Sequence, residues 1–220
     1  MKDSDFQSEG LYVFCIDVGG PAKIGWSDAE GRDGTGANLG EALDRLAALL
    51  LAGRRVALGF EAPIWTPARM ELARITGRRG GVEATYNRAW SAGAGTGALG
   101  AALALMPWCL MRIAKGTGPI ATTVDLQRFL DRGGLFLWEA FVSGAMKAVG
   151  TTHHDDARLA CEAFVARWPN LFSDIPAEPA LNHSVSSAMI AGLLINQDEL
   201  MMPALVVGVA AKAADEPITI

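Results

Sequence analysis

The sequence predicts an α/β domain, and three observations support that prediction. Apolar runs of strand length alternate with segments whose leucines and alanines repeat at helical spacing. The first apolar run is followed by a Gly-Gly-Pro turn and a return segment, which indicates a hairpin before the first helix. With 220 residues, 50% of them hydrophobic and 20% charged, the chain can bury the core of a single domain over residues 1–220.

The N-terminal elements are a strand, its return and a helix. Residues 11–18 are a continuous apolar run bounded by glycines and are expected to form a central strand, and residues 23–29 return beside it. The glycine-rich residues 30–38 hold at most a short third strand. Leucines spaced three or four residues apart predict a helix over residues 38–51, with Asn38 as a candidate N-cap.

The middle of the chain contains a second strand of the same kind and then a long insertion. Residues 54–62 are apolar and end at Pro63, which cannot continue a ladder. Residues 63–97 are irregular and rich in arginine, and we expect an insertion loop there. Residues 98–115 predict a buried helix, which is shorter than the roughly 20 apolar residues that a bilayer span needs.

The last part of the chain predicts another strand between helices. Residues 124–130 form a short helix and residues 134–142 an apolar strand. A helix follows over residues 152–168, capped by Thr152 or Asp155. Residues 170–220 are expected to be a C-terminal helical extension, with its helix at residues 183–195 and no prediction beyond Leu205.

Carboxylates lie near the ends of three predicted strands. Asp17, Glu61 and Glu139 follow or interrupt apolar runs, and Asp155 and Asp156 open a predicted helix. A buried charge costs several kcal/mol unless it is paired or bound to a cation. Carboxylates at the ends of neighbouring strands meet at one edge of a sheet. Because oxygen ligands suit Mg²⁺ or Mn²⁺, a metal site is predicted at that edge.

Each of these carboxylates also has a structural explanation. Asp17 could cap the turn that follows it, and Glu61 could pair with an arginine of the insertion. Asp155 and Asp156 occupy a helix N-terminus, where the helix dipole alone favours acidic residues. For Glu139 the structural role is favoured.

The segments "CIDVGGPAKIGWSD", "VALGFEAP" and "HHDDARLACEAF" together resemble the ribonuclease H-like superfamily, in particular the RuvC-type resolvases and related predicted nucleases. The resemblance implies a mixed five-stranded sheet with helices on both faces and a helical insertion. It implies that Asp17, Glu61 and Asp156 are catalytic metal-binding acids, with Asp155 as an additional or alternative ligand. In an alternative alignment the last acid falls on the helix at residues 183–195, where Ser184, Ser186 and Ser187 stand instead.

The implied activity is nuclease activity, a phosphodiester hydrolysis with two Mg²⁺ or Mn²⁺ ions, which Asp17 would bridge. The insertion is expected to contact nucleic acid, although its arginines could equally form a solvated helix face. The residues expected to contact phosphate are Arg69, Arg78, Arg79 and Arg88, and those expected to stack on bases are Trp65, Tyr86 and Trp90.

Histidines and cysteines offer a weaker signal. His153 and His154 could start the helix, form a zinc pair or carry protons beside the acids. The chain has only three histidines, and Cys15, Cys109 and Cys161 lie far apart in apolar surroundings, so zinc is disfavoured and buried reduced thiols are expected.

Charge and terminal composition limit the partners. The net charge of −5 argues against binding nucleic acid through overall charge and leaves a local basic loop as the contact. The first ten residues lack the pattern of a signal peptide, so we expect a cytoplasmic protein without a membrane span. The apolar helices leave the oligomeric state open.

Three other functions compete with nuclease activity. "GTGALG" matches G-x-G-x-x-G, but no strand is predicted before it, so we interpret it as a helix start and not as a dinucleotide site. Sugar kinases and actin-like ATPases share the opening strand and hairpin, but they need a second such lobe that this chain lacks. A non-catalytic binding or scaffold module with the same fold is the main alternative.

Overall fold

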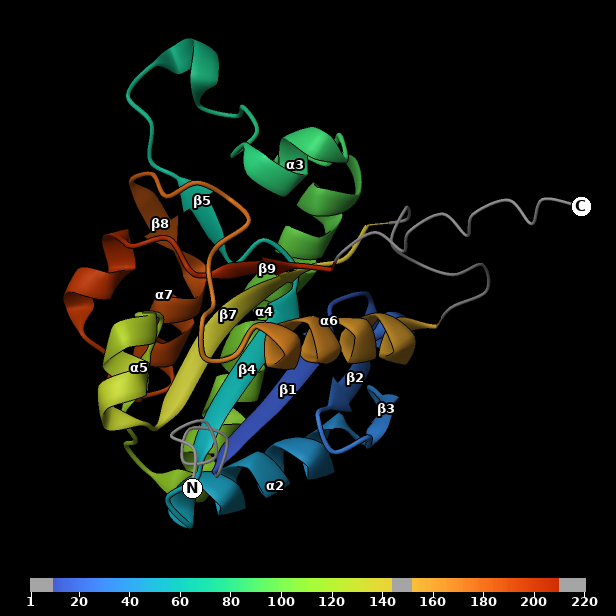
Figure 1. Ribbon diagram of the computed structural model, residues 1–220, viewed down its shortest axis with the longest axis vertical. Coiled ribbons are helices and arrows are strands. Elements are labelled where there is room, and N and C mark those ends of the chain that lie inside the picture. The colour runs from blue at the N-terminus through green and yellow to red at the C-terminus, as the bar shows by residue number, and fades with distance from the viewer. Residues whose placement is uncertain (1–9, 144–151, 210–220) are drawn as a thin grey trace, which may run out of the picture.

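A mixed, mostly parallel sheet of seven strands organises the part of the chain that the structure describes, residues 10–143 and 152–209 of a computed structural model (Figure 1). Its strands are β1 (Leu11–Asp17), β2 (Gly25–Asp28), β3 (Asp33–Thr35), β4 (Arg55–Glu61), β6 (Thr122–Thr123), β7 (Leu135–Phe141) and β9 (Val206–Gly208). The order is β3-β2-β1-β4-β7, with β6 and β9 both paired to β7. The β1–β2 and β2–β3 pairs are antiparallel and the others are parallel.

Helices cover both faces of this sheet. The helices are α2 (Leu39–Leu51), α3 (Gly81–Thr85), α4 (Gly93–Thr117), α5 (Leu126–Arg132), α6 (His153–Arg167) and α7 (His183–Ile190). Because side chains alternate along a strand, Tyr12, Phe14 and Ile16 of β1 enter a core with α2, α4 and α7. Val13 and Cys15 enter a second core with α6. Figure 1 shows α6 crossing one face and α4 lying behind the other.

The predicted α/β class is therefore confirmed, but the expected five strands are too few. β6 is only two residues long, and β9 lies in the tail for which no element was predicted. A second sheet joins β5 (Trp65–Pro67) to β8 (Ala180–Asn182). The predicted insertion thus contains β5, α3 and the start of α4. The C-terminal extension contributes strands as well as α7, because tertiary pairing orders segments too short to show a period of their own.

α4 is longer and more exposed than predicted. It begins at Gly93 and includes the "GTGALG" segment, which confirms a helix start there. Gly95 is required because a Cβ at this position would lie 2.2 Å from the Ala89 carbonyl oxygen. Leu103, Trp108 and Met111 are 43–49% exposed, so the prediction of a buried helix was wrong on that face. By length and composition α4 could cross a membrane, and in this structure it packs against α2 and α7.

Three helix ends can be compared with the capping and breaking residues around them, namely the starts of α6 and α2 and the end of α7. Thr152 caps α6 as predicted, by accepting a hydrogen bond from the Asp155 backbone. Asn38 makes no capping hydrogen bond with α2; its Oδ1 instead accepts from the Trp26 indole and the Thr35 backbone. α7 ends at Ile190 and not at residue 195, because Gly192 adopts a positive φ of 76° that breaks the helix.

Candidate metal centre

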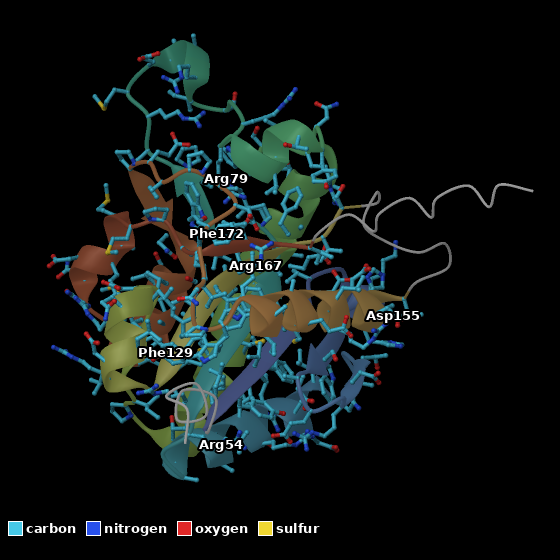
Figure 2. The ribbon with its side chains drawn as sticks, in the orientation of Figure 1. Arg54, Arg79, Phe129, Asp155, Arg167 and Phe172 are labelled. Carbon is cyan, nitrogen blue, oxygen red and sulfur yellow. The ribbon has the colours of Figure 1, made fainter. Side chains whose placement is uncertain are left out.

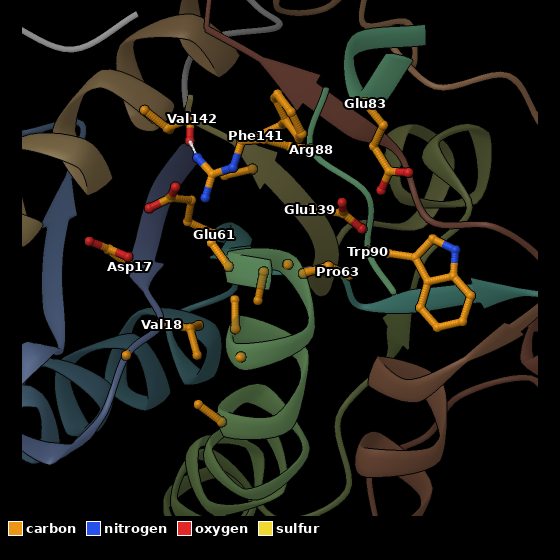
Figure 3. Close-up of a pocket in the computed structure, with 18 of the residues that line it drawn as sticks. Asp17, Val18, Glu61, Pro63, Glu83, Arg88, Trp90, Glu139, Phe141 and Val142 are labelled. Carbon is orange, nitrogen blue, oxygen red and sulfur yellow. Dashed lines mark hydrogen bonds between the residues drawn. The ribbon is translucent and has the colours of Figure 1, made fainter. Parts of the chain in front are cut away.

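Strand alternation places Asp17 and Glu61 side by side. They are the last residues of β1 and β4 and are directly paired in the parallel register. Adjacent strands lie about 4.8 Å apart, so paired residues project from neighbouring points on the same face. That face is the one covered by α6, since Asp17 has the same parity as Val13 and Cys15. Figure 3 shows the two carboxylates side by side at the pocket.

The start of α6 adds two candidate ligands to this corner, the imidazole of His153 and the carboxylate of Asp156. Gly25 of β2 pairs with Asp17, and a Cβ on Gly25 would lie 2.3 Å from the His153 carbonyl carbon and 2.4 Å from the His154 nitrogen. The absent side chain therefore lets the helix backbone rest on the strand. As a result His153 Nδ1 lies 2.5 Å from Asp17 Oδ2, and ligand atoms of Asp17, His153 and Asp156 all lie within 4.8 Å of one another.

This cluster is buried on its acidic side and open through the histidine. Asp17 is 5% exposed and Asp156 is 4% exposed, whereas the His153 side chain is 47% exposed. Both acids were predicted as ligands from the sequence, whereas His153 was given three alternative roles, as a helix start, a zinc ligand or a proton carrier. Its position at the first turn of a helix that also carries Asp156 was the signal that pointed to it.

Asp155 lies outside this cluster. Its carboxylate accepts hydrogen bonds from the Thr152 backbone nitrogen at 2.9 Å and the Thr152 hydroxyl at 2.7 Å, and it pairs with Arg158 at 3.2 Å. The hydrogen bonds from Thr152 and the Arg158 ion pair hold the pKa of Asp155 well below its usual value. Figure 2 shows Asp155 at the outer end of α6. The structure thus gives Asp155 a capping role and does not bring it to the predicted site.

A pocket of about 490 Å³ opens beside the carboxylates. Asp17, Glu61 and His153 line one side, together with Lys23 from the turn after β1. Arg88 enters from the insertion, where its Nη1 donates to the Val142 carbonyl at 2.9 Å, as the dashed line in Figure 3 marks. The rest of the lining comes from the first turns of α4, from Arg79, Glu83 and Trp90 of the insertion, and from Glu139 and the residues that follow it.

Glu139 belongs to a different group on the opposite face of the sheet. It pairs with Phe60, whose ring lies in the core with α2 and α4, so its parity is opposite to that of Asp17 and Glu61. Arg79 donates two hydrogen bonds to its carboxylate, at 2.9 and 2.5 Å, and also binds Glu83. Burial raises the pKa of Glu139, and the Arg79 guanidinium opposes that shift. This explains the structural role favoured for Glu139.

The predicted phosphate-binding arginines are mostly engaged by the protein itself. Arg69 holds Glu178 with two hydrogen bonds of 2.7 and 2.6 Å and also donates to carbonyls of its own loop. Arg79 is buried between two carboxylates, with its guanidinium 4.5 Å from the Trp65 ring centroid. Arg78 is exposed and lies outside the pocket lining. Of the four, Arg88 is placed to reach a ligand in the pocket.

Of the three aromatic residues expected to stack on bases, Trp90 lines the pocket. Trp65 is fully buried, so its predicted stacking role is wrong. The Trp90 indole donates to the Gly77 carbonyl at 3.1 Å and points away from Asp17 in Figure 3. Tyr86 packs against Phe141, with ring centroids 6.2 Å apart.

The positions of the cysteines and of the helix with three serines decide between the roles left open by the sequence. Cys15, Cys109 and Cys161 are buried free thiols whose pKa values are raised by burial, as expected. The helix with the three serines is α7, and its buried Val185 and Ala188 lie in the core on the face opposite to Asp17. The acid that lies close to Asp17 is therefore Asp156 of α6, and α7 packs on the other face of the sheet.

Comparisons of the chain with protein-family models, with curated proteins and with solved structures gave no match. What the chain does is therefore inferred from the arrangement of its own residues.

Proposed function

We propose that this protein is a metal-dependent phosphodiester hydrolase of the ribonuclease H-like type. The acids lie on the three elements where the resemblance expects them, namely the first strand, the fourth strand and a later helix packed on the first. The observation that carries the proposal is the convergence of Asp17, His153 and Asp156 within 4.8 Å, with Glu61 paired to Asp17.

The donor set fits a divalent cation. Asp17 and Asp156 offer carboxylate oxygens, the ligands that Mg²⁺ and Mn²⁺ prefer, and His153 adds an imidazole nitrogen. Glu61 lies outside this group of three but is paired with Asp17 and lines the pocket. A bound cation of this kind supplies Lewis-acid activation of a phosphoryl group and lowers the pKa of water. The burial of Asp17 and Asp156 makes such a cation a suitable counter-charge for them.

The protein's own groups orient a substrate around these acids. Arg88 is anchored to the Val142 carbonyl, which restricts its guanidinium to the rim of the pocket, where it can hold a phosphate oxygen. The His153 imidazole lies with Nδ1 2.5 Å from Asp17 Oδ2 and is half-exposed, so it connects the buried carboxylate to the pocket.

The test is a calorimetric titration of Mg²⁺ and Mn²⁺ into the wild type and three variants. Asp17→Asn and Asp156→Asn should lower metal affinity by at least about tenfold, because each removes a charged ligand. Asp155→Asn is the matched control, one residue away on the same helix, and should bind metal as the wild type does. Hydrolysis of bis(4-nitrophenyl) phosphate should follow the same order.

Absence of metal binding by the wild type at millimolar concentration would contradict the proposal. So would equal metal affinity in all four proteins. Either result favours the alternative of a non-catalytic binding or scaffold module, in which the Asp17–His153 pair is only a structural contact.

A further inference from the structure

The shape of the pocket limits what can reach the carboxylates. Its volume of about 490 Å³ lies in the range of about 300–1,000 Å³ that accommodates small organic ligands. The wall formed by the start of α4 carries no polar side chain, since it consists of Ala94, Gly95, Gly97, Ala98 and Ala101. A smooth apolar wall of this kind suits a flat ring lying against it.

The positive charges around the pocket are few and local. Lys23 and Arg88 both line it, Lys23 from the turn after β1 and Arg88 from the insertion. The Arg79 guanidinium also lines it but is neutralised by Glu139 and Glu83. Two cations beside a carboxylate-bound metal suffice for a single phosphodiester, which carries one negative charge.

An extended nucleic acid would require more than this. Binding along a strand depends on a cationic groove that contacts successive phosphates and on aromatic side chains that stack on successive bases. Within the described residues, Arg69 is paired with Glu178, Arg78 lies outside the pocket and Trp65 is fully buried. Of the residues expected to contact a strand, Arg88 and Trp90 line the pocket beside the neutralised Arg79, and these are too few to contact successive nucleotides.

We propose, on the basis of the proposed function, that the pocket takes a phosphodiester with one nucleotide-sized arm. The phosphate lies toward Asp17 and Glu61, between Lys23 and Arg88, and the base lies against the glycine–alanine wall of α4. Hydrolysis forms a bond from the water oxygen to phosphorus, breaks the bond from phosphorus to the leaving alkoxide and returns a proton to that alkoxide. Two sources share this chemistry, a free nucleotide ester and the end of a single strand.

Two glycines of α4 provide a matched pair of variants. A Cβ at Gly97 or at Gly100 would meet no atom within 4 Å, so a side chain starts in open space at either position, but of the two only Gly97 lines the pocket. Both substitutions replace a helical glycine and should not impair folding. Gly97→Leu fills the space assigned to the base, whereas Gly100→Leu leaves it open.

The experiment measures thymidine 5′-monophosphate binding by calorimetry with Mn²⁺ present, and hydrolysis of its 4-nitrophenyl ester. Gly97→Leu should weaken nucleotide binding and lower kcat/KM by at least about tenfold, the equivalent of about 1.4 kcal/mol. Gly100→Leu should change neither, and Mn²⁺ affinity should be the same in all three proteins. Linear single-stranded DNA should be cleaved from its end if strand ends are the source, and left intact if free esters are.

The proposal is overturned if the nucleotide does not bind, if Gly97→Leu behaves as Gly100→Leu does, or if circular single-stranded DNA is cleaved as fast as linear DNA. In the last case metal binding and hydrolysis persist, so the proposed function stands while the substrate assignment fails. Loss of the proposed function is recognised separately, because the wild type then binds no metal and hydrolyses none of these substrates, which overturns both.

Discussion

Two groups of buried acids lie at the same edge of the central sheet, and they differ in what lies beside their carboxylates. Asp17 and Glu61 end their strands on the face covered by α6, where a histidine opens the cluster to a pocket. Glu139, two residues before the end of β7, faces the other side and is neutralised by the buried Arg79. An acid's group therefore depends on which face of the sheet its side chain points to, which is set by its odd or even position along the strand. Its distance from the strand end does not decide this.

The largest expected effect comes from breaking the Arg79 group. Arg79→Met leaves Glu139 and Glu83 buried without their guanidinium, and should lower the free energy of unfolding by about 3–5 kcal/mol. Urea denaturation measures this. Adding Glu139→Gln and Glu83→Gln should restore much of the stability, because no unpaired charge then remains and the amide oxygens still accept from the Ile64 and Arg79 backbone N–H groups. Arg158→Met, which breaks surface ion pairs, is the control and should cost about 0–1 kcal/mol. Equal losses for Arg79→Met and Arg158→Met would refute the comparison.

The next effect concerns the approach of α6 to the acids. Gly25→Ala places a methyl group within 2.3 Å of the His153 backbone, so α6 must move away from β2. We expect a stability loss of about 1–3 kcal/mol and a loss of Mn²⁺ affinity of about 10–100-fold, since the ligands themselves are retained but displaced. Gly100→Ala, with nothing within 4 Å, should leave metal affinity unchanged. Unaltered Mn²⁺ affinity in Gly25→Ala would show that the position of α6 does not set the site.

A smaller effect is expected from the cap of α6. Thr152→Ala removes the side chain that accepts the Asp155 N–H and donates to its carboxylate, and should cost about 0.5–2 kcal/mol in thermal or urea unfolding. Thr152→Ser keeps the hydroxyl and serves as the control. If Thr152→Ala is as stable as the wild type, the capping box contributes nothing to the stability of the fold.

The smallest effect is the pH dependence contributed by Asp155. Because its pKa is lower in the folded protein than in the unfolded chain, its charge stabilises the fold above the unfolded pKa of about 3.9. That contribution is lost as the pH falls through the folded value. The advantage of the wild type over Asp155→Asn should be about 0.5 kcal/mol near neutral pH and should shrink below about pH 4. An advantage that grows in acid would contradict this sign.

Local patterns in the sequence determined a large part of this molecule. The apolar runs predicted β1, β4 and β7, and the hairpin turn predicted β2, because alternation and turn chemistry act over a few residues. Asp17, Glu61 and Asp156 could be named in advance for the same reason, as acids that interrupt or cap otherwise apolar elements. The roles of these acids and of the cation stay predictions that the metal titration tests.

Contacts between distant segments decided the rest. β9 forms by pairing with β7. Arg79 lies in a basic insertion but binds Glu139, which is 60 residues away in the chain. Neither event has a local signature, since short strands and ion pairs depend on what lies opposite them in space. The sequence by itself determined which residues could bind a metal. The tertiary structure decided which of them meet, through strand parity and the approach of α6 to Gly25, because both are properties of packed elements and not of single segments.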